Sequence, residues 1–164
     1  MRATALQKRA MASHFPPQAE RRLLLVSLQK RIPQSQIFPF HFFADDLERH
    51  YGAAVREVAI EQVLNGGSIP TGATTIAFQT EFDIDTAELA QLLAKLQQHN
   101  PGARMVYLDW TAPADLRNAA RLNSRVDVYV KKHVLRDRSL YGRPTLGDTN
   151  LCDYYARRAS LPEQ

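Results

Sequence analysis

Apolar residues in this chain gather in short runs, separated by polar stretches that contain glycine and proline. The first run, RRLLLVSL at 21–28, is continuous, which is typical of a strand buried on both faces of a parallel sheet. Four later runs, rich in β-branched or aromatic residues, predict further strands. They lie at 55–60, 74–79, 104–110 and 126–130.

Helical spacing of apolar residues is clearest at 86–98, where several leucines fall on one face of the predicted helix. Asp85 or Thr86 can cap its amino end. Glu88 stands three residues after Asp85, which is the arrangement of a capping box. The sequence therefore predicts both this helix and its starting point.

Two more helices are predicted between the strands. One spans 40–51, with Pro39 at its start and Gly52 at its end, where proline and glycine are favoured. The other spans 113–122. Because strands alternate with helices, the sequence predicts an α/β fold, a Rossmann-like three-layer sandwich with a mainly parallel sheet of about five strands.

A chain of 164 residues is long enough for one domain with a hydrophobic core. We expect a flexible basic N-terminal extension at 1–20 and the Rossmann-like domain at 21–135. The remaining residues, 136–164, form a polar, basic segment that we expect to line a cleft or to join two domains.

Composition and charge bear on the cellular location of the protein and on the class of partner that it binds. No apolar run approaches the roughly 18–20 residues of a membrane span, so no transmembrane segment is predicted. The single cysteine, Cys152, cannot form an internal disulfide, which fits a cytoplasmic protein. Residues 1–31 hold seven basic residues and one acid (net +6), whereas 32–130 hold seven and twelve (net −5). A nucleic-acid-binding protein more typically carries basic residues along its folded elements, so the sequence argues against that partner.

Motifs of the common nucleotide and metal sites are missing from the sequence. Neither GxGxxG nor a Walker lysine motif follows the first strand, which argues against NAD binding and nucleotide hydrolysis. The five histidines show no metal-binding spacing such as HExxH, and one cysteine excludes a zinc knuckle. We therefore expect no cofactor and no metal, and the catalytic residues are unassigned.

Candidate ligand-binding residues follow the last two predicted strands, because open α/β sheets bind ligands at the carboxyl ends of their strands. Asp109 and Trp110 offer a carboxylate and a stacking face to a sugar ring, or else a helix cap and a core aromatic residue. Lys131 and Lys132 precede His133, which acts either as a general base or as an ordinary surface histidine.

The segment 131–158, KKHVLRDRSLYGRPTLGDTNLCDYYARR, is polar and holds seven basic residues against three acids, a net charge of +4. Such a segment after a regular scaffold is typical of a functional region. An anionic ligand that carries phosphate suits its charge. Its further candidate residues are Arg136, Arg138, Tyr141, Arg143, Asp148 and Asn150.

With these residues in view, the chain resembles the N-terminal, acceptor-side half of GT-B type bacterial glycosyltransferases, close to family 1-like proteins. The resemblance spans 21–158 and rests on RRLLLVSL, RMVYLDWTAP and VDVYVKKHVLRDRSLYGRPTLGDTNLCDYYARR. It implies a domain that binds the sugar acceptor, while a second domain binds the nucleotide-sugar donor across a cleft. Arg136, Arg138 and Arg143 would face acceptor or diphosphate oxygens in that cleft.

In that family a linker to the second Rossmann domain would begin where this sequence ends, at Gln164. The resemblance thus implies a glycosyltransferase-like domain that contributes acceptor binding and works with a second domain or a partner chain, since transfer requires both substrates to be held together. The predicted substrate-binding residues are Asp109, Trp110, Lys131, Lys132, His133, Arg136, Arg138, Tyr141, Arg143, Asp148 and Asn150.

A second interpretation of the same residues stays open. The chain would then be a non-catalytic α/β interaction module that binds a protein partner through its basic C-terminal segment. A third, binding of RNA or DNA, would require an affinity that falls steeply with salt.

Overall fold

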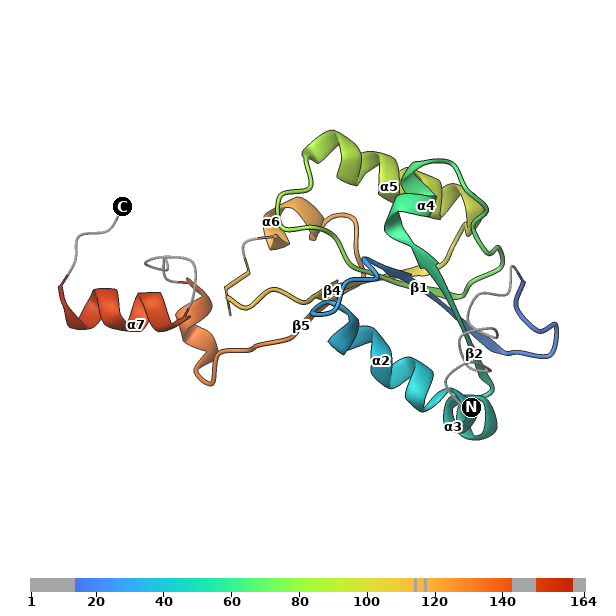
Figure 1. Cartoon of the computed structure of the whole chain (residues 1–164), viewed down its shortest axis with the longest axis horizontal. Helices are drawn as coiled ribbons and strands as arrows, with labels where there is room; N and C mark the ends of the chain where they lie inside the picture. Colours follow the sequence, from blue (N-terminus) through green and yellow to red (C-terminus); the bar gives the residue numbers. More distant parts are fainter. Residues whose placement is uncertain (1–13, 114, 117, 143–149, 161–164) are drawn as a thin grey trace.

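The computed structural model describes residues 14–113, 115, 116, 118–142 and 150–160, with backbone only at 150 and 151. Within these residues, five parallel strands form one sheet in the order β2-β1-β3-β4-β5 (Figure 1). The strands are β1 (Arg21–Ser27), β2 (Ala53–Ala59), β3 (Thr75–Phe78), β4 (Arg104–Asp109) and β5 (Val128–Lys131). The predicted α/β class and Rossmann-like parallel sheet are confirmed.

Helices cover both faces of the sheet (Figure 1). They are α2 (Gln34–Phe42), α3 (Ala44–Tyr51), α4 (Ile60–Leu64), α5 (Thr86–His99), α6 (Ala119–Leu122) and α7 (Asn150–Arg158), with the 3₁₀ helix η1 (Arg138–Gly142). On one face, α4, α5 and α6 pack over the sheet, and α2 and α3 lie on the other. The result is the three-layer arrangement expected from the sequence.

The interior strand β1 contributes to the cores on both faces of the sheet. Leu24 and Val26 belong to the larger core under α4 and α5, and Leu25 belongs to the smaller core under α2. All three side chains are fully buried. The continuous apolar run of β1 is thus explained by its place in the sheet, with a strand on each side and a helical layer on each face.

The helix α5 begins and packs as its sequence predicts. Asp85 has extended backbone geometry, and its Oδ1 accepts a hydrogen bond of 2.7 Å from the backbone N–H of Glu88. The leucines of α5 at 89, 92, 93 and 96 are buried against the sheet. A helix cap and an apolar face together fix this element.

The prediction that a helix starts at Pro39 is wrong. The helix α2 begins five residues earlier, at Gln34, and Pro39 lies inside it. Phe43 then separates α2 from α3, which ends at Gly52 as predicted. Gly52 has φ +59, a left-handed conformation that glycine adopts without strain. The single helix predicted at 40–51 is therefore replaced by two helices, α2 and α3.

Two other elements differ from the prediction. Within the described part of 113–122, only Ala119–Leu122 is helical, because Pro113, Asp115 and Leu116 lie in a bend and loop before it. The short helix α4 follows β2 directly, and its Ile60 and Val63 are buried. The strands begin and end within two residues of their predicted bounds.

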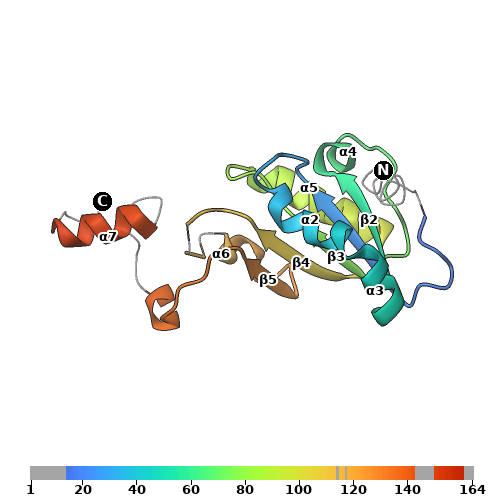
Figure 2. The ribbon, with the colours of Figure 1, turned by 60° about the horizontal axis from the view of Figure 1, so that its bottom comes forward.

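The two ends of the described chain differ in how they meet the sheet. Phe15 is partly buried against the larger core, and the Arg56 guanidinium lies 5.8 Å from the centre of its ring. His14 forms an isolated β-bridge with Thr71, so this part of the predicted extension packs on the body. By contrast, α7 lies apart from the sheet in both views (Figures 1 and 2). None of the helices that the structure describes is both long and apolar enough to cross a bilayer.

Candidate functional site

The carboxyl ends of the strands form one edge of the sheet, and the strand order reverses there between β1 and β3. From β1 the chain first crosses to β2 on one side, and later strands are added on the other side. In open α/β sheets this switch point is where ligands bind, because the loops after the two strands part there and leave a crevice.

The loop after β1 reaches across this switch point to the loop after β3. Gln29 holds a left-handed backbone conformation, with φ +51, which is uncommon for a residue other than glycine. The next residue, Lys30, forms an exposed ion pair with Glu81. The hydrogen bond to Glu81 outweighs desolvation and raises the pKa of Lys30 above its ordinary value of 10.5. The rim of the switch point is therefore charged.

Beneath this rim lies a buried amide, Gln79, directly after β3. Its Nε2 donates to the Pro33 carbonyl at 2.9 Å and to Gln36 Oε1 at 3.3 Å. Gln36 in turn donates to the Asp109 carbonyl at 3.1 Å. The Oε1 of Gln79 is buried and accepts no hydrogen bond from the described residues. Amides thus tie α2 to the ends of β3 and β4.

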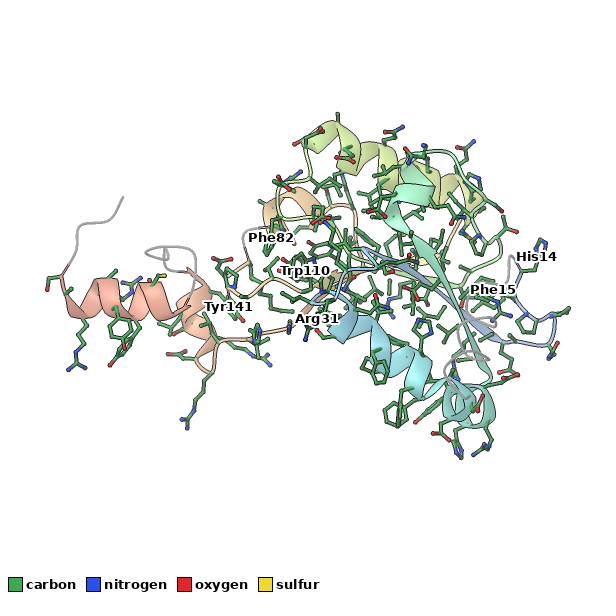
Figure 3. The ribbon with its side chains drawn as sticks, in the orientation of Figure 1. His14, Phe15, Arg31, Phe82, Trp110 and Tyr141 are labelled. Atoms are coloured by element: carbon green, nitrogen blue, oxygen red, sulfur yellow. The ribbon has the colours of Figure 1, made fainter. Side chains whose placement is uncertain are left out.

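An aromatic pair stands beside the charged rim. Phe82 is 53% exposed, and its ring centroid lies 4.5 Å from that of Trp110. Trp110 is buried and donates from Nε1 to the Thr80 carbonyl at 2.8 Å. Figure 3 shows both rings at the same end of the molecule as Arg31 and Tyr141. The accessible aromatic face at this edge is therefore that of Phe82, with Trp110 as its support.

Asp109, at the end of β4, is fully buried and is surrounded by donors. Its Oδ1 accepts from the Thr111 backbone N–H at 3.0 Å and from the Thr111 hydroxyl at 2.6 Å. Its Oδ2 accepts from Lys131 Nζ at 2.9 Å and from the Tyr129 hydroxyl at 2.5 Å. The Lys131 side chain is only 4% exposed. This buried ion pair joins the ends of β4 and β5.

Two tyrosines beside this ion pair are held neutral. Burial, together with the hydrogen bond to Asp109, raises the pKa of Tyr129 far above its ordinary value. Burial also raises the pKa of Tyr107 to about 12, with a smaller contribution from the Asp109 charge. Tyr107 shares hydrogen bonds with Thr80 and Asn118. The polar groups of this network are therefore hydrogen-bonded to one another beneath the carboxyl edge of the sheet.

A second polar cluster lies between α2 and the strands β1 and β2. Burial opposes ionisation of Glu57, but hydrogen bonds with His41 and Ser27 outweigh it and lower the Glu57 pKa. His41 Nε2 lies 2.6 Å from Glu57 Oε2, and the Ser27 hydroxyl donates to Glu57 Oε1. Because serine and histidine both contact the carboxylate and not each other, this arrangement is not that of a serine nucleophile activated by histidine.

The structure places the predicted site residues in different surroundings. Asp109 and Trp110 are buried at the strand ends, where the Lys131 side chain is also largely buried. Lys132, His133, Arg136 and Arg138 are exposed on the segment that follows β5. Tyr141 is half-buried, and its hydroxyl accepts from the Leu135 backbone N–H at 2.9 Å. Arg143 and Asp148 lie outside the described residues, and Asn150 begins α7. Their roles in ligand binding stay predictions.

Phe82 is the site residue that the sequence reasoning missed. It follows Glu81 in a polar loop, and neither strand nor helix spacing includes it. A lone aromatic residue between Glu81 and Asp83 was the available signal, since an apolar side chain in such a loop needs a partner. Among the residues that the structure describes, no group of three or more His, Cys, Asp or Glu side chains is placed to hold a metal.

No protein-family model matches the chain, and no curated protein matches it.

Proposed function

We propose that the chain is a glycosyltransferase-like acceptor domain that binds a sugar at the carboxyl edge of its sheet. The observation that carries this proposal is the exposed ring of Phe82, supported by Trp110, beside the charged pair Lys30 and Glu81. Sugars present apolar C–H faces together with hydroxyl groups, so a site for them requires an aromatic surface with polar groups at its border. The sequence resemblance points to the same class of ligand.

In the proposed complex, one face of the sugar ring lies on Phe82. The Glu81 carboxylate accepts hydrogen bonds from sugar hydroxyls, and Lys30 donates to sugar oxygens. The pair is exposed, with 57% of the Lys30 and 35% of the Glu81 side chain accessible. Replacing the contact between Lys30 and Glu81 by contacts with a ligand therefore costs little free energy.

Positive side chains around the same edge favour an acceptor that carries phosphate. Arg31 follows Lys30 in the loop after β1, and Lys132 follows β5. Both are exposed. Arginine binds phosphate oxygens through paired N–H groups, and lysine adds a point charge. A sugar linked to a phosphate or diphosphate would contact both the aromatic surface and these cations.

The proposal assigns binding to this edge and leaves the transfer step to groups on the donor side. Asp109 directly precedes Trp110, but its oxygens already accept from Thr111, Tyr129 and Lys131. It therefore positions the strand ends and does not meet a ligand in this arrangement. Acceptor binding with a partner domain that supplies the donor is the role we propose.

A thermal-shift titration with sugar phosphates, simple glycans and nucleotide-sugars tests this function. A ligand that binds only the folded state at 100 times its Kd adds about 2.7 kcal/mol of stability. We expect a shift with sugar phosphates in wild type and its loss in Phe82→Ala. Tyr51→Ala is the matched control, because Tyr51 is a 58% exposed aromatic residue at the end of α3.

Two results would refute the proposal. One is that none of these ligands shifts the wild-type melting temperature. The other is that Phe82→Ala and Tyr51→Ala show the same shift as wild type, because binding would then lie elsewhere. A shift with free nucleotides that survives Phe82→Ala would indicate a donor site and not an acceptor site.

A further inference from the structure

The outer side of α2 carries a patch of exposed aromatic rings. Phe38, Phe42 and Phe43 are 59%, 62% and 51% exposed. The ring centroids of Phe38 and Phe42 lie 5.7 Å apart, and those of Phe42 and Phe43 lie 4.9 Å apart with their planes nearly perpendicular. Three exposed phenylalanines joined through the ring of Phe42 mark an interaction surface, since aromatic residues are enriched at the centres of protein interfaces.

Acidic side chains border this patch. The helix α3 starts directly after Phe43 and carries Asp45 and Asp46 in its first turn. Glu48 follows on the same helix, and Asp45 and Glu48 line a hollow of about 180 Å³ between α3 and β2. We call the aromatic patch together with Asp45 and Asp46 the α2–α3 face. A partner for this face needs aromatic groups and positive charge.

The helix α7 carries that chemistry. Tyr154 and Tyr155 are 53% and 58% exposed, and their rings contact each other edge to face at 5.2 Å. Arg157 and Arg158 stand in the last turn of the helix. Arg157 pairs with Asp153, and Arg158 donates to the Tyr154 hydroxyl. Figure 2 shows the helix held away from the sheet.

We propose that α7 of one copy binds the α2–α3 face of a second copy, and that the exchange is reciprocal. Tyr154 and Tyr155 would pack on Phe38 and Phe42, with the arginines of α7 beside the acids of α3. A two-fold dimer forms this contact twice, because each copy offers both surfaces. The argument for a second copy is that charge and aromatic character on the two surfaces are complementary within this one sequence.

This inference does not depend on the proposed sugar site. The α2–α3 face lies over β1 and β2 on the outer side of α2, whereas Phe82 lies at the carboxyl edge. A protein that binds no sugar could still form the proposed dimer, and a monomeric protein could still bind a sugar at Phe82.

Light scattering after gel filtration, over a range of protein concentrations, measures the oligomeric state. We expect a concentration-dependent dimer for wild type. In Tyr154→Ser/Tyr155→Ser and in Phe38→Ser/Phe42→Ser we expect dimerisation to weaken at least about tenfold, because aromatic anchors dominate interface energies. Phe82→Ser, which removes an equally exposed ring elsewhere, should dimerise as wild type does. All these side chains are exposed, so the fold is retained.

A mixing experiment separates exchange between copies from other arrangements. The tyrosine variant keeps an intact α2–α3 face, and the phenylalanine variant keeps an intact α7. An equimolar mixture should therefore form heterodimers through one intact contact, tighter than either variant forms alone. Charge reversal gives the matching electrostatic test: Arg157→Glu/Arg158→Glu should weaken the dimer, and Asp45→Lys/Asp46→Lys in the same chain should restore it.

Three outcomes would overturn the inference. The first is a wild-type chain that stays monomeric at every concentration. The second is a dimer that both pairs of serine substitutions leave unchanged, since its contact would then lie elsewhere. The third is a mixture that shows no heterodimer, because α7 would then bind its own chain or a different partner.

Discussion

Removal of the Asp109 carboxylate should destabilise the fold strongly. Asp109 is fully buried, and Lys131 beside it is 4% exposed. Breaking a buried ion pair by removing one partner costs about 3–5 kcal/mol, because the remaining charge stays buried without its counterion. In Asp109→Ala, Lys131 Nζ keeps the Thr111 hydroxyl as an acceptor at 2.8 Å. We therefore expect a loss at the lower end, about 3 kcal/mol.

Urea unfolding at neutral pH measures this loss as a change in the free energy of unfolding. The matched control is Glu81→Ala, which removes the carboxylate of the exposed pair with Lys30. Exposed pairs contribute below about 1 kcal/mol, so the control should stay close to wild type. If Asp109→Ala loses no more stability than Glu81→Ala, the assignment of Asp109 to a buried ion pair is refuted.

The double variant tests whether the two charges act as one unit. Lys131→Met should cost less in the Asp109→Ala background than in wild type, since no buried carboxylate is left without a cation. The difference should be on the order of 0.5–3 kcal/mol, as for other residues in contact. Additive losses would mean that Asp109 and Lys131 contribute separately. This measurement should precede any test of Asp109 in ligand binding, because an unstable variant binds poorly for reasons unrelated to the site.

Two further predictions concern local structure. Asp85→Ala removes the cap of α5 and should lower the free energy of unfolding by about 1 kcal/mol, while Asp85→Asn, which can still accept from Glu88, should lose less. Burial would raise the Glu57 pKa, but hydrogen bonds from His41 and Ser27 lower it below its ordinary value of 4.5. The folded state therefore gains stability from Glu57 above pH 4.5 and loses it as the pH falls through the lowered pKa. Glu57→Gln should flatten this acid-side loss in unfolding experiments between about pH 3 and 6, a range that spans the ordinary pKa of glutamate, and an unchanged pH profile would contradict the assignment.

The parts of the fold that the sequence predicted are those set by local patterns. The leucines of α5 and the Asp85 cap lie within one stretch, so spacing alone fixes that helix. Pro39 shows where a local rule fails. Proline favours a helix start, but the burial of Ile37 against the sheet holds the chain helical from Gln34 onward. Packing outweighed the propensity of one residue.

The candidate site was harder to predict because it depends on strand register. Asp109 and Lys131 are paired across β4 and β5, although they are separated by 22 positions in the sequence. Nothing in either stretch tells which residues face each other, so the sequence predicted Asp109 as a ligand contact or a helix cap, and Lys131 as a ligand contact, without pairing them. Phe82 was not predicted as a site residue for a similar reason, since its contact with Trp110 forms between two loops that come together only in the folded sheet.

The buried pair of Asp109 and Lys131 also sets the mechanics of the C-terminal part. β5 is a four-residue strand at the border of the sheet, with a neighbour on one side only. Such a strand would fray from its last residue, but here that residue, Lys131, is held to β4 by its ion pair with Asp109. The segment that carries η1 and α7 therefore leaves the sheet at Lys132. A force on α7 that reaches β5 would therefore also act on β4 through the ion pair of Asp109 and Lys131.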